Sequence, residues 1–159
     1  MKRTDFSVDW LFAACAPDTE LLPWNAQFTP VDLPHDWQIR HADDLYRDGT
    51  LFYRKYFFVT DVPGTRRMLW FGGAYMDTTV FVNGTEVGQW KYGYTSFWFD
   101  ITDALHEGQN AVLVRCNLRH PNSRWYSGAG LYRNVELWEP PDLHLMPDGL
   151  PVAAKEGDN

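Results

Sequence analysis

The stretch RWYSGAGLYR, from Arg124 to Arg133, combines bulky aromatic and arginine side chains with glycine, serine and alanine. Aromatic rings and guanidinium groups contact ligands, whereas glycine allows tight turns and close backbone approach. A segment of this composition is compatible with an active-site loop, a platform for ring stacking or a tight corner between strands. The elements that surround it decide between these three roles.

No other combination of residues indicates a catalytic or metal site. The five histidines are scattered and lack the spacing of zinc ligands. A Gly-x-Ser-x-Gly nucleophile elbow does not occur, and the glycine pair in WFGGAY precedes a β-rich hairpin rather than the helix that follows a phosphate-binding loop. The 21 acidic residues contain no pair that stands out for glycoside hydrolysis. We therefore expect no catalytic residue, no metal and no cofactor in this chain.

Composition and charge limit the class of protein. A length of 159 residues suits one domain with a hydrophobic core, and 45% hydrophobic with 22% charged residues is ordinary for a soluble globular protein. The aromatic content of 16% is high, which indicates an aromatic core or rings on the surface. A net charge of -7 without a basic run argues against nucleic acid and anionic membrane surfaces as partners.

The ends and the cysteines add little further information. The apolar patch WLFAAC near the start is too short for a signal peptide, and no apolar stretch is long enough to span a membrane, so we expect a cytoplasmic protein. Cys116 lies in an apolar strand pattern and is expected to be a small buried residue. Whether it meets Cys15 stays open, because the two are far apart in the sequence.

Short strand patterns separated by turns dominate the chain. In NAVLVRCNL (110–118), Val112, Val114, Cys116 and Leu118 share one face. Asn83-Gly84 lies between two β-prone arms and predicts a type I′ hairpin over 77–90. We expect one helical turn over 102–106, followed by a turn at Gly108. Further strands are predicted within 51–59, 66–73, 94–102 and 131–138.

Many short strands without long amphipathic helices predict an all-β fold, an antiparallel β-sandwich or barrel. The N-terminal fifty residues are loop-rich, and residues 21–49 are expected to wrap around the sandwich. We predict one domain over 1–140, and a linker or the start of a further domain over 141–159, where proline and glycine are frequent.

Four segments in order resemble one known family: VDLPHDWQI (31–39), FYRKYF (52–57), FGGAYMDTTVFVNGTEVGQWKYGYTSFWFDIT (71–102) and PNSRWYSGAGLYRNVEL (121–137). Together they are similar to the N-terminal sugar-binding domain of glycoside hydrolase family 2, especially its β-galactosidase-like members. The resemblance covers roughly residues 6–140 and implies a jelly-roll β-sandwich of the galactose-binding-domain-like type.

The resemblance also implies a role within a larger enzyme. In that family an immunoglobulin-like domain and a (β/α)₈ barrel follow the sandwich, and two barrel glutamates perform retaining hydrolysis. A barrel needs about 200 residues or more, so this chain has no room for one. The chain is therefore expected to be non-catalytic by itself. Its expected partners are the two C-terminal domains and, within the full enzyme, a carbohydrate of the β-galactoside type.

Within the resemblance, two segments are expected near the sugar. The rings of Trp125 and Tyr126 can face the C–H side of a pyranose, and Arg124 and Asn122 can bind its hydroxyls. The loop over 40–50 is the other candidate, through Asp44 and Tyr46.

Several alternatives remain open at this stage. Trp125 and Tyr126 can instead fill the end of the sandwich or a seam between domains, and Arg133 can be an inward arginine bound to a buried carboxylate or to carbonyls. Asp36 is expected to form a turn beside a packed Trp37. A free-standing carbohydrate-binding module, which would use exposed rings such as Trp90, Tyr92, Tyr94 or Trp125, is the alternative to an accessory domain of a glycosidase.

Overall fold

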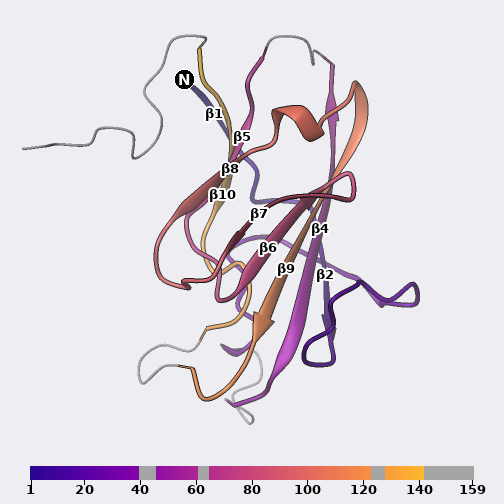
Figure 1. Cartoon of the computed structure of the whole chain (residues 1–159), viewed down its shortest axis with the longest axis vertical. Coiled ribbons are helices and arrows are strands. Elements are labelled where there is room, and N and C mark those ends of the chain that lie inside the picture. The colour runs from indigo at the N-terminus through magenta and orange to yellow at the C-terminus, as the bar shows by residue number, and fades with distance from the viewer. Residues whose placement is uncertain (40–45, 61–64, 123–127, 142–159) are drawn as a thin grey trace, which may run out of the picture.

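Two antiparallel β-sheets pack face to face and enclose an aromatic core (Figure 1). The computed structural model describes residues 1–39, 46–60, 65–122 and 128–141. One sheet has the strand order β3-β2-β4-β9-β6-β7 and the other β1-β10-β5-β8. The all-β, jelly-roll sandwich predicted from the strand patterns and the resemblance is thereby confirmed. The strands are β1 (Lys2–Asp5), β2 (Trp10–Cys15), β3 (Thr29–Val31), β4 (Gly49–Val59), β5 (Met68–Phe71), β6 (Thr78–Val82), β7 (Thr85–Trp90), β8 (Phe97–Asp100), β9 (Gly108–Leu118) and β10 (Val135–Glu139).

The long pair of β4 and β9 forms the centre of the six-stranded sheet. Their register runs from Gly49 opposite Leu118 to Val59 opposite Gly108. The alternation predicted for β9 is confirmed, because its inward residues Val112, Val114, Cys116 and Leu118 are all 0% exposed. Full burial of such a side chain contributes about 1.5–3 kcal/mol relative to exposure, so this face of β9 anchors the core.

The hairpin between β6 and β7 turns at Asn83-Gly84, as predicted. Both residues have the positive φ of a type I′ turn, 51° and 84°. The Asn83 amide also donates to the Ala104 carbonyl (2.8 Å) and to Asn110 Oδ1 (2.7 Å), while its oxygen accepts from the Ala111 N–H (2.9 Å). The expected helical turn is a 3₁₀ helix over Thr102–Ala104. The hairpin is therefore tied to the start of β9.

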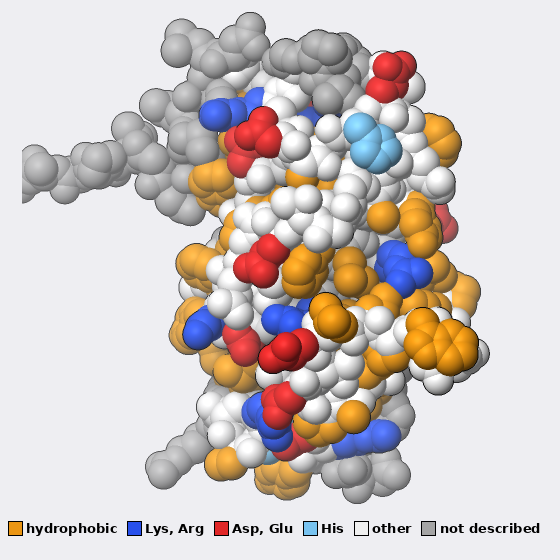
Figure 2. All heavy atoms as spheres, turned by 45° about the vertical axis from the view of Figure 1, so that its right-hand side comes forward, with side chains coloured by type: hydrophobic (Ala, Val, Ile, Leu, Met, Phe, Trp, Pro, Cys, Tyr) orange, Lys and Arg blue, Asp and Glu red, His pale blue; other side chains and the backbone are white. Residues whose placement is uncertain are grey.

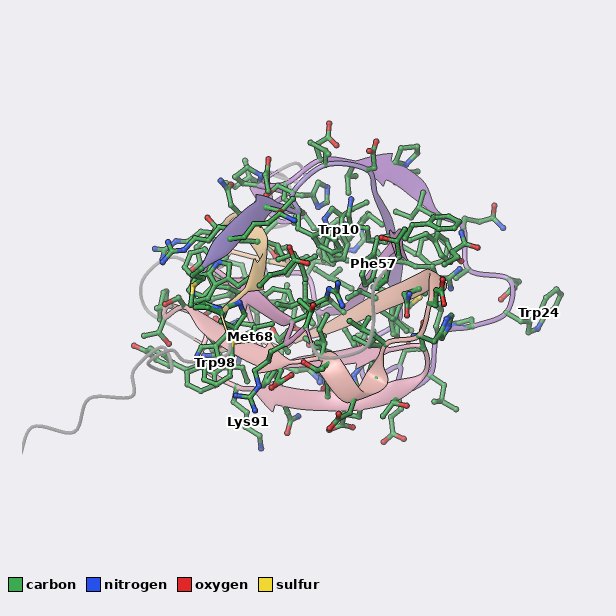
Figure 3. All side chains as sticks on the ribbon, turned by 90° about the horizontal axis from the view of Figure 1, so that it is seen from above. Trp10, Trp24, Phe57, Met68, Lys91 and Trp98 are labelled. Atoms are coloured by element: carbon green, nitrogen blue, oxygen red, sulfur yellow. The ribbon has the colours of Figure 1, made fainter. Side chains whose placement is uncertain are left out.

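Strands β1, β2 and β3 were not predicted from the sequence, and β3 lies within the segment 21–49 that was expected to wrap around the sandwich. β1 pairs with β10 at the edge of the four-stranded sheet, and β2 lies between β3 and β4. Trp10 of β2 is 0% exposed, lies between the sheets and donates its indole N–H to the Phe6 carbonyl at 2.7 Å (Figure 3). Trp24, in contrast, is 98% exposed at the tip of a loop that projects from the sandwich (Figure 3).

The surface mixes charges and exposed hydrophobic side chains. On the face drawn in Figure 2, acidic, basic and hydrophobic side chains are interspersed. Both cysteines are free thiols: Cys15 is half-buried and Cys116 is fully buried, as expected for the latter. Burial raises the pKa of the Cys116 thiol to about 12. None of the described helical segments has the length and hydropathy needed to cross a bilayer.

Candidate functional site

One end of the sandwich gathers the two described residues that sequence analysis assigned to sugar binding. β4 begins there with Gly49, and β9 ends opposite it at Leu118. Tyr46 precedes β4 by a few residues and is 80% exposed, and its ring meets the His120 ring edge-on, with the centroids 5.8 Å apart. Asn122 follows His120 by two residues. The predicted residues Asp44, Arg124, Trp125 and Tyr126 lie outside the described residues.

Asn122 is held by the core through its side-chain oxygen. The Tyr75 hydroxyl donates to Asn122 Oδ1 at 3.2 Å, and Tyr75 itself is only 2% exposed. The buried nitrogen of the same amide, Nδ2, has no hydrogen-bond partner among the described residues. The Asn122 side chain is therefore fixed by its oxygen and keeps one unsatisfied, buried donor.

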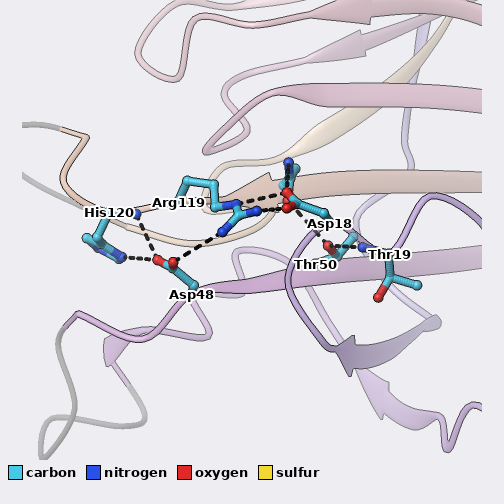
Figure 4. Close-up of polar contacts among 7 residues, drawn as sticks. Asp18, Thr19, Asp48, Thr50, Arg119 and His120 are labelled. Carbon is cyan, nitrogen blue, oxygen red and sulfur yellow. Dashed lines mark hydrogen bonds and ion pairs between the residues drawn. The ribbon is translucent and has the colours of Figure 1, made fainter.

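A carboxylate that the sequence analysis did not single out, Asp48, orders this end (Figure 4). Its Oδ1 accepts from the His120 backbone N–H (2.7 Å) and lies 3.1 Å from His120 Nδ1. Because a carboxylate only accepts, Nδ1 carries the proton in this contact. The other ring nitrogen, Nε2, is buried and has no partner among the described residues. In the neutral ring the buried Nε2 is therefore an acceptor.

A second carboxylate extends this network along the sheet (Figure 4). Asp18 forms an ion pair with Arg119, whose Nε donates to it at 2.8 Å, and accepts from Asn117 Nδ2 at 3.3 Å. Arg119 Nη1 also lies 3.7 Å from Asp48 Oδ2. These groups are about half exposed, so water screens the ion pair and it contributes little to stability. The ion pair instead fixes the position of Arg119, the first residue after the end of β9.

Asp36 has the turn-forming role predicted for it. Its Oδ1 accepts from the backbone N–H groups of Gln38 (2.9 Å) and Ile39 (3.3 Å), and Trp37 beside it is 6% exposed. The same oxygen accepts from the Ala129 N–H at 3.2 Å, which joins this turn to the described part of the RWYSGAGLYR segment.

The described half of that segment packs inward. Ala129 and Leu131 are 0% exposed, and Gly130 forms an antiparallel bridge with Tyr75, with N–H···O distances of 2.7 and 2.9 Å. Gly130 has a φ of 95°, and a Cβ on it would overlap the Tyr53 hydroxyl. Gly130 therefore packs against the core residue Tyr53, and the position has no room for a side chain.

Arg133 is not the inward arginine considered from strand parity. The residue is exposed, precedes β10, and donates from Nη1 to the Gly72 carbonyl at 3.2 Å. Because β10 begins only at Val135, strand alternation does not extend back to residue 133, and the inward orientation considered for Arg133 is wrong.

No group of three or more histidine, cysteine or carboxylate side chains with metal-binding geometry occurs among the residues that the structure describes. The site therefore consists of hydrogen-bonding groups on rigid supports, a carboxylate-held imidazole and a core-held amide, with an exposed aromatic ring at its edge. This chemistry suits recognition of a hydroxyl-rich ligand.

Comparison with known proteins shows the family of the chain. A beta-galactosidase of Bacteroides ovatus, BoGH2A, is 36% identical over 176 aligned residues, which cover 99% of this chain and 20% of that protein. A beta-glucuronidase of Bacteroides fragilis is 35% identical over 107 residues, covering 59% of this chain and 15% of that protein. This chain thus spans a fifth or less of the length of these relatives.

The fold is found in solved structures as well. A glycosyl hydrolase family 2 member from Bacteroides cellulosilyticus superposes with a TM-score of 0.73 at 31% identity, over 87% of this chain and 21% of that one. Residues 23–141 match the model of the sugar binding domain of glycosyl hydrolases family 2. The chain therefore belongs to glycosyl hydrolases family 2 and contains the sugar-binding domain of that family.

Proposed function

We propose that this chain is the non-catalytic N-terminal domain of a family 2 glycosidase, best described as a β-galactosidase. The observation that carries the proposal is the family match over residues 23–141, combined with the small share of each relative that the chain covers. The relatives are named beta-galactosidases and beta-glucuronidases, so a β-glycoside is the class of substrate. We favour a galactoside because the relative named a beta-galactosidase matches 99% of this chain, whereas the beta-glucuronidase of Bacteroides fragilis matches 59%.

In this proposal the domain extends over residues 1–140, and residues 141–159 lead into an immunoglobulin-like domain. A barrel beyond it supplies the two glutamates for retaining hydrolysis. The sandwich contributes no reacting group and completes the wall of the substrate pocket. The residues that we expect to take part are Asp44, Tyr46, Asn122, Arg124, Trp125 and Tyr126. Of these, the described residues Tyr46 and Asn122 belong to the end at which β4 begins and β9 ends.

The geometry supports this role in one specific way. Tyr46 and Asn122 are 76 positions apart in the numbering, and the pairing of β4 with β9 brings both to one end. Their supports are rigid, because Asn122 is held by buried Tyr75 and the His120 backbone by Asp48. Preorganised groups of this kind improve binding because less freedom is lost when the ligand arrives.

The test uses the complete enzyme with Trp125→Ala and Asn122→Ala. Each should lower kcat/KM for a β-galactoside about three- to tenfold, the effect of losing about 0.7–1.4 kcal/mol of binding. The chemistry supplied by the barrel should remain measurable. Trp24→Ala is the matched control, because Trp24 is equally large but 98% exposed on a separate loop, and it should leave kcat/KM unchanged. Unchanged kinetics and oligomeric state in both site variants would remove these residues from the substrate pocket.

A further inference from the structure

The outer face of the four-stranded sheet carries a layer of tryptophans. Leu69 and Phe71 of β5 and Phe97 of β8 belong to the core, as does Val135 of β10. Since side chains alternate along a strand, the residues between them point away from the core. Three of these are tryptophans: Trp70, Trp98 and Trp138. Outward positions of a β-sandwich are usually polar, so this layer needs a separate explanation.

The tryptophan layer is ordered by ring contacts. Trp70 and Trp138 stack with their centroids 5.5 Å apart and an angle of 11° between the planes. The Arg3 guanidinium lies over the Trp138 ring, 4.5 Å from its centroid. Trp98 of β8 lies opposite Trp70 of β5 in the register of the two strands. Because Trp138 is covered while Trp70 stays partly exposed, Trp70 is the ring of the stacked pair that can meet a ligand.

A hollow of about 460 Å³ opens beside Trp70. Its volume lies within the range of small-molecule sites, about 300–1,000 Å³. It shares no lining residue with the polar end of β4 and β9 described above. The groups that matter for recognition are Trp70, Ser96, Tyr132, Arg133, Asn134 and Glu136.

The charged groups of this hollow are held in place without being neutralised. Glu136 Oε2 accepts from the Trp138 indole N–H at 2.6 Å, which leaves Oε1 as an acceptor. Arg133 is fixed by the Gly72 carbonyl and by the Tyr132 ring, whose centroid is 5.1 Å from the guanidinium carbon. In the described part of the chain, neither Arg133 nor Glu136 forms an ion pair. The Asn134 side chain is exposed and adds an amide that donates and accepts.

We propose that this hollow binds a neutral pyranose, one sugar unit of an oligosaccharide, at a second carbohydrate site. The C–H face of the sugar packs on Trp70, and its hydroxyls bind Arg133, Asn134 and Glu136. A flat ring beside planar polar side chains matches a pyranose, which has an apolar face and an equatorial rim of hydroxyls. The ligand is neutral because a uronate or phosphate that approached Arg133 would also face Glu136. This inference does not depend on the proposed enzymatic role.

The experiment titrates the ¹⁵N-labelled 159-residue chain with methyl β-D-galactopyranoside and follows backbone and indole N–H signals by NMR. The indole N–H signal that is missing from the spectrum of Trp70→Phe is assigned to Trp70. We expect saturable shifts of that indole and of the amides of residues 132–136, with a Kd in the millimolar range. Asn134→Ala, a change at an exposed side chain, should raise Kd about fivefold, the effect of one hydrogen bond. Trp24→Ala, a change at a ring that is 98% exposed on a separate loop, should leave Kd unchanged.

Three results would overturn the inference. The first is the absence of shifts at Trp70 and residues 132–136 in about 50 mM sugar, where even a Kd of about 10 mM would be visible. The second is binding that Asn122→Ala removes and Asn134→Ala does not, which places the sugar at the other end. The third is tighter binding of methyl β-D-glucuronide than of the galactoside, which excludes a neutral ligand. None of them affects the proposed function, since that is measured as kcat/KM of the complete enzyme.

Discussion

Replacing Gly130 by alanine should destabilise the fold far more than the same change at Gly108. Both glycines have nearly the same left-handed backbone, with φ of 95° and 96°. An L-residue in this region costs about 1–2 kcal/mol, so this cost is common to both variants. The surroundings differ: a Cβ on Gly108 meets nothing within 4 Å, whereas a Cβ on Gly130 overlaps the Tyr53 hydroxyl.

The additional cost at Gly130 can be worked out from what Tyr53 would lose. Its hydroxyl lies 2.8 Å from His35 Nδ1 in the buried core, and displacement of the ring breaks this hydrogen bond. Overpacking costs about 1–3 kcal/mol, and leaving a buried polar pair unsatisfied costs about 1–3 kcal/mol more. Together with the shared backbone cost, we expect Gly130→Ala to lower the free energy of unfolding by about 3–8 kcal/mol, against about 1–2 kcal/mol for Gly108→Ala.

Urea unfolding of the three proteins, followed by tryptophan fluorescence, measures these differences. Because the total stability of a domain is about 5–15 kcal/mol, Gly130→Ala should remain measurable unless the parent is at the low end. A Tyr53→Phe background keeps the test informative, since removal of the hydroxyl should reduce the cost of Gly130→Ala. Equal destabilisation by the two glycine changes, or no relief by Tyr53→Phe, would refute the assigned contact.

Further predictions concern single side chains. Asp48→Ala should lower the free energy of unfolding by about 1–2 kcal/mol, because the His120 backbone N–H loses its acceptor, and an unchanged urea midpoint would contradict this. The hydrogen bond from Lys2 lowers the pKa of Glu139 below its usual 4.5, so its stabilisation is complete above that pH and is lost as the pH falls through the folded-state pKa. The difference in Tm between the wild type and Glu139→Gln should therefore shrink from about pH 6 to about pH 3.5, and a growing difference would reverse the sign of the assigned shift. Iodoacetamide at about pH 8 should modify Cys15 before Cys116, because the Cys116 thiol is fully buried with a pKa of about 12. Mass spectrometry measures this order, and rapid native modification of Cys116 would show that the core opens there.

Strong local signals made part of the fold predictable from sequence. From Val112 to Leu118 the inward residues of β9 are apolar and alternate with larger or polar ones, which is the pattern of a strand buried on one face. Asn83-Gly84 is a sequence that favours positive φ at both positions and thereby specifies the turn type. Both predictions depended on near neighbours only.

The first strands could not be identified because their sequences lack such a pattern. β1 reads KRTD and is exposed at every position, since it is an edge strand that Lys2, Arg3 and the pairing with β10 hold in place. β2 reads WLFAAC, and a short apolar run does not distinguish a strand from a buried helical segment. Only tertiary pairing with β4 specifies its conformation.

The candidate site was predicted incompletely for a related reason. Tyr46 and Asn122 were identified through the family resemblance, whereas Asp48 and His120, which order the same end, were not. These two are 72 residues apart in sequence and meet because β4 and β9 pair over eleven positions each. No local pattern carries that information. The tryptophan layer on β5, β8 and β10 was missed because hydrophobic residues on both faces of a strand remove the alternation that indicates burial.

Hydrolysis of p-nitrophenyl β-D-galactopyranoside, compared between the complete gene product and the 159-residue chain, tests most directly whether this domain serves a family 2 glycosidase. We predict hydrolysis by the complete product and none above the buffer rate by this chain alone. Hydrolysis by the chain alone at a comparable rate would contradict the non-catalytic role. A complete product that hydrolyses neither the galactoside nor the corresponding glucuronide would contradict the assignment to a glycosidase.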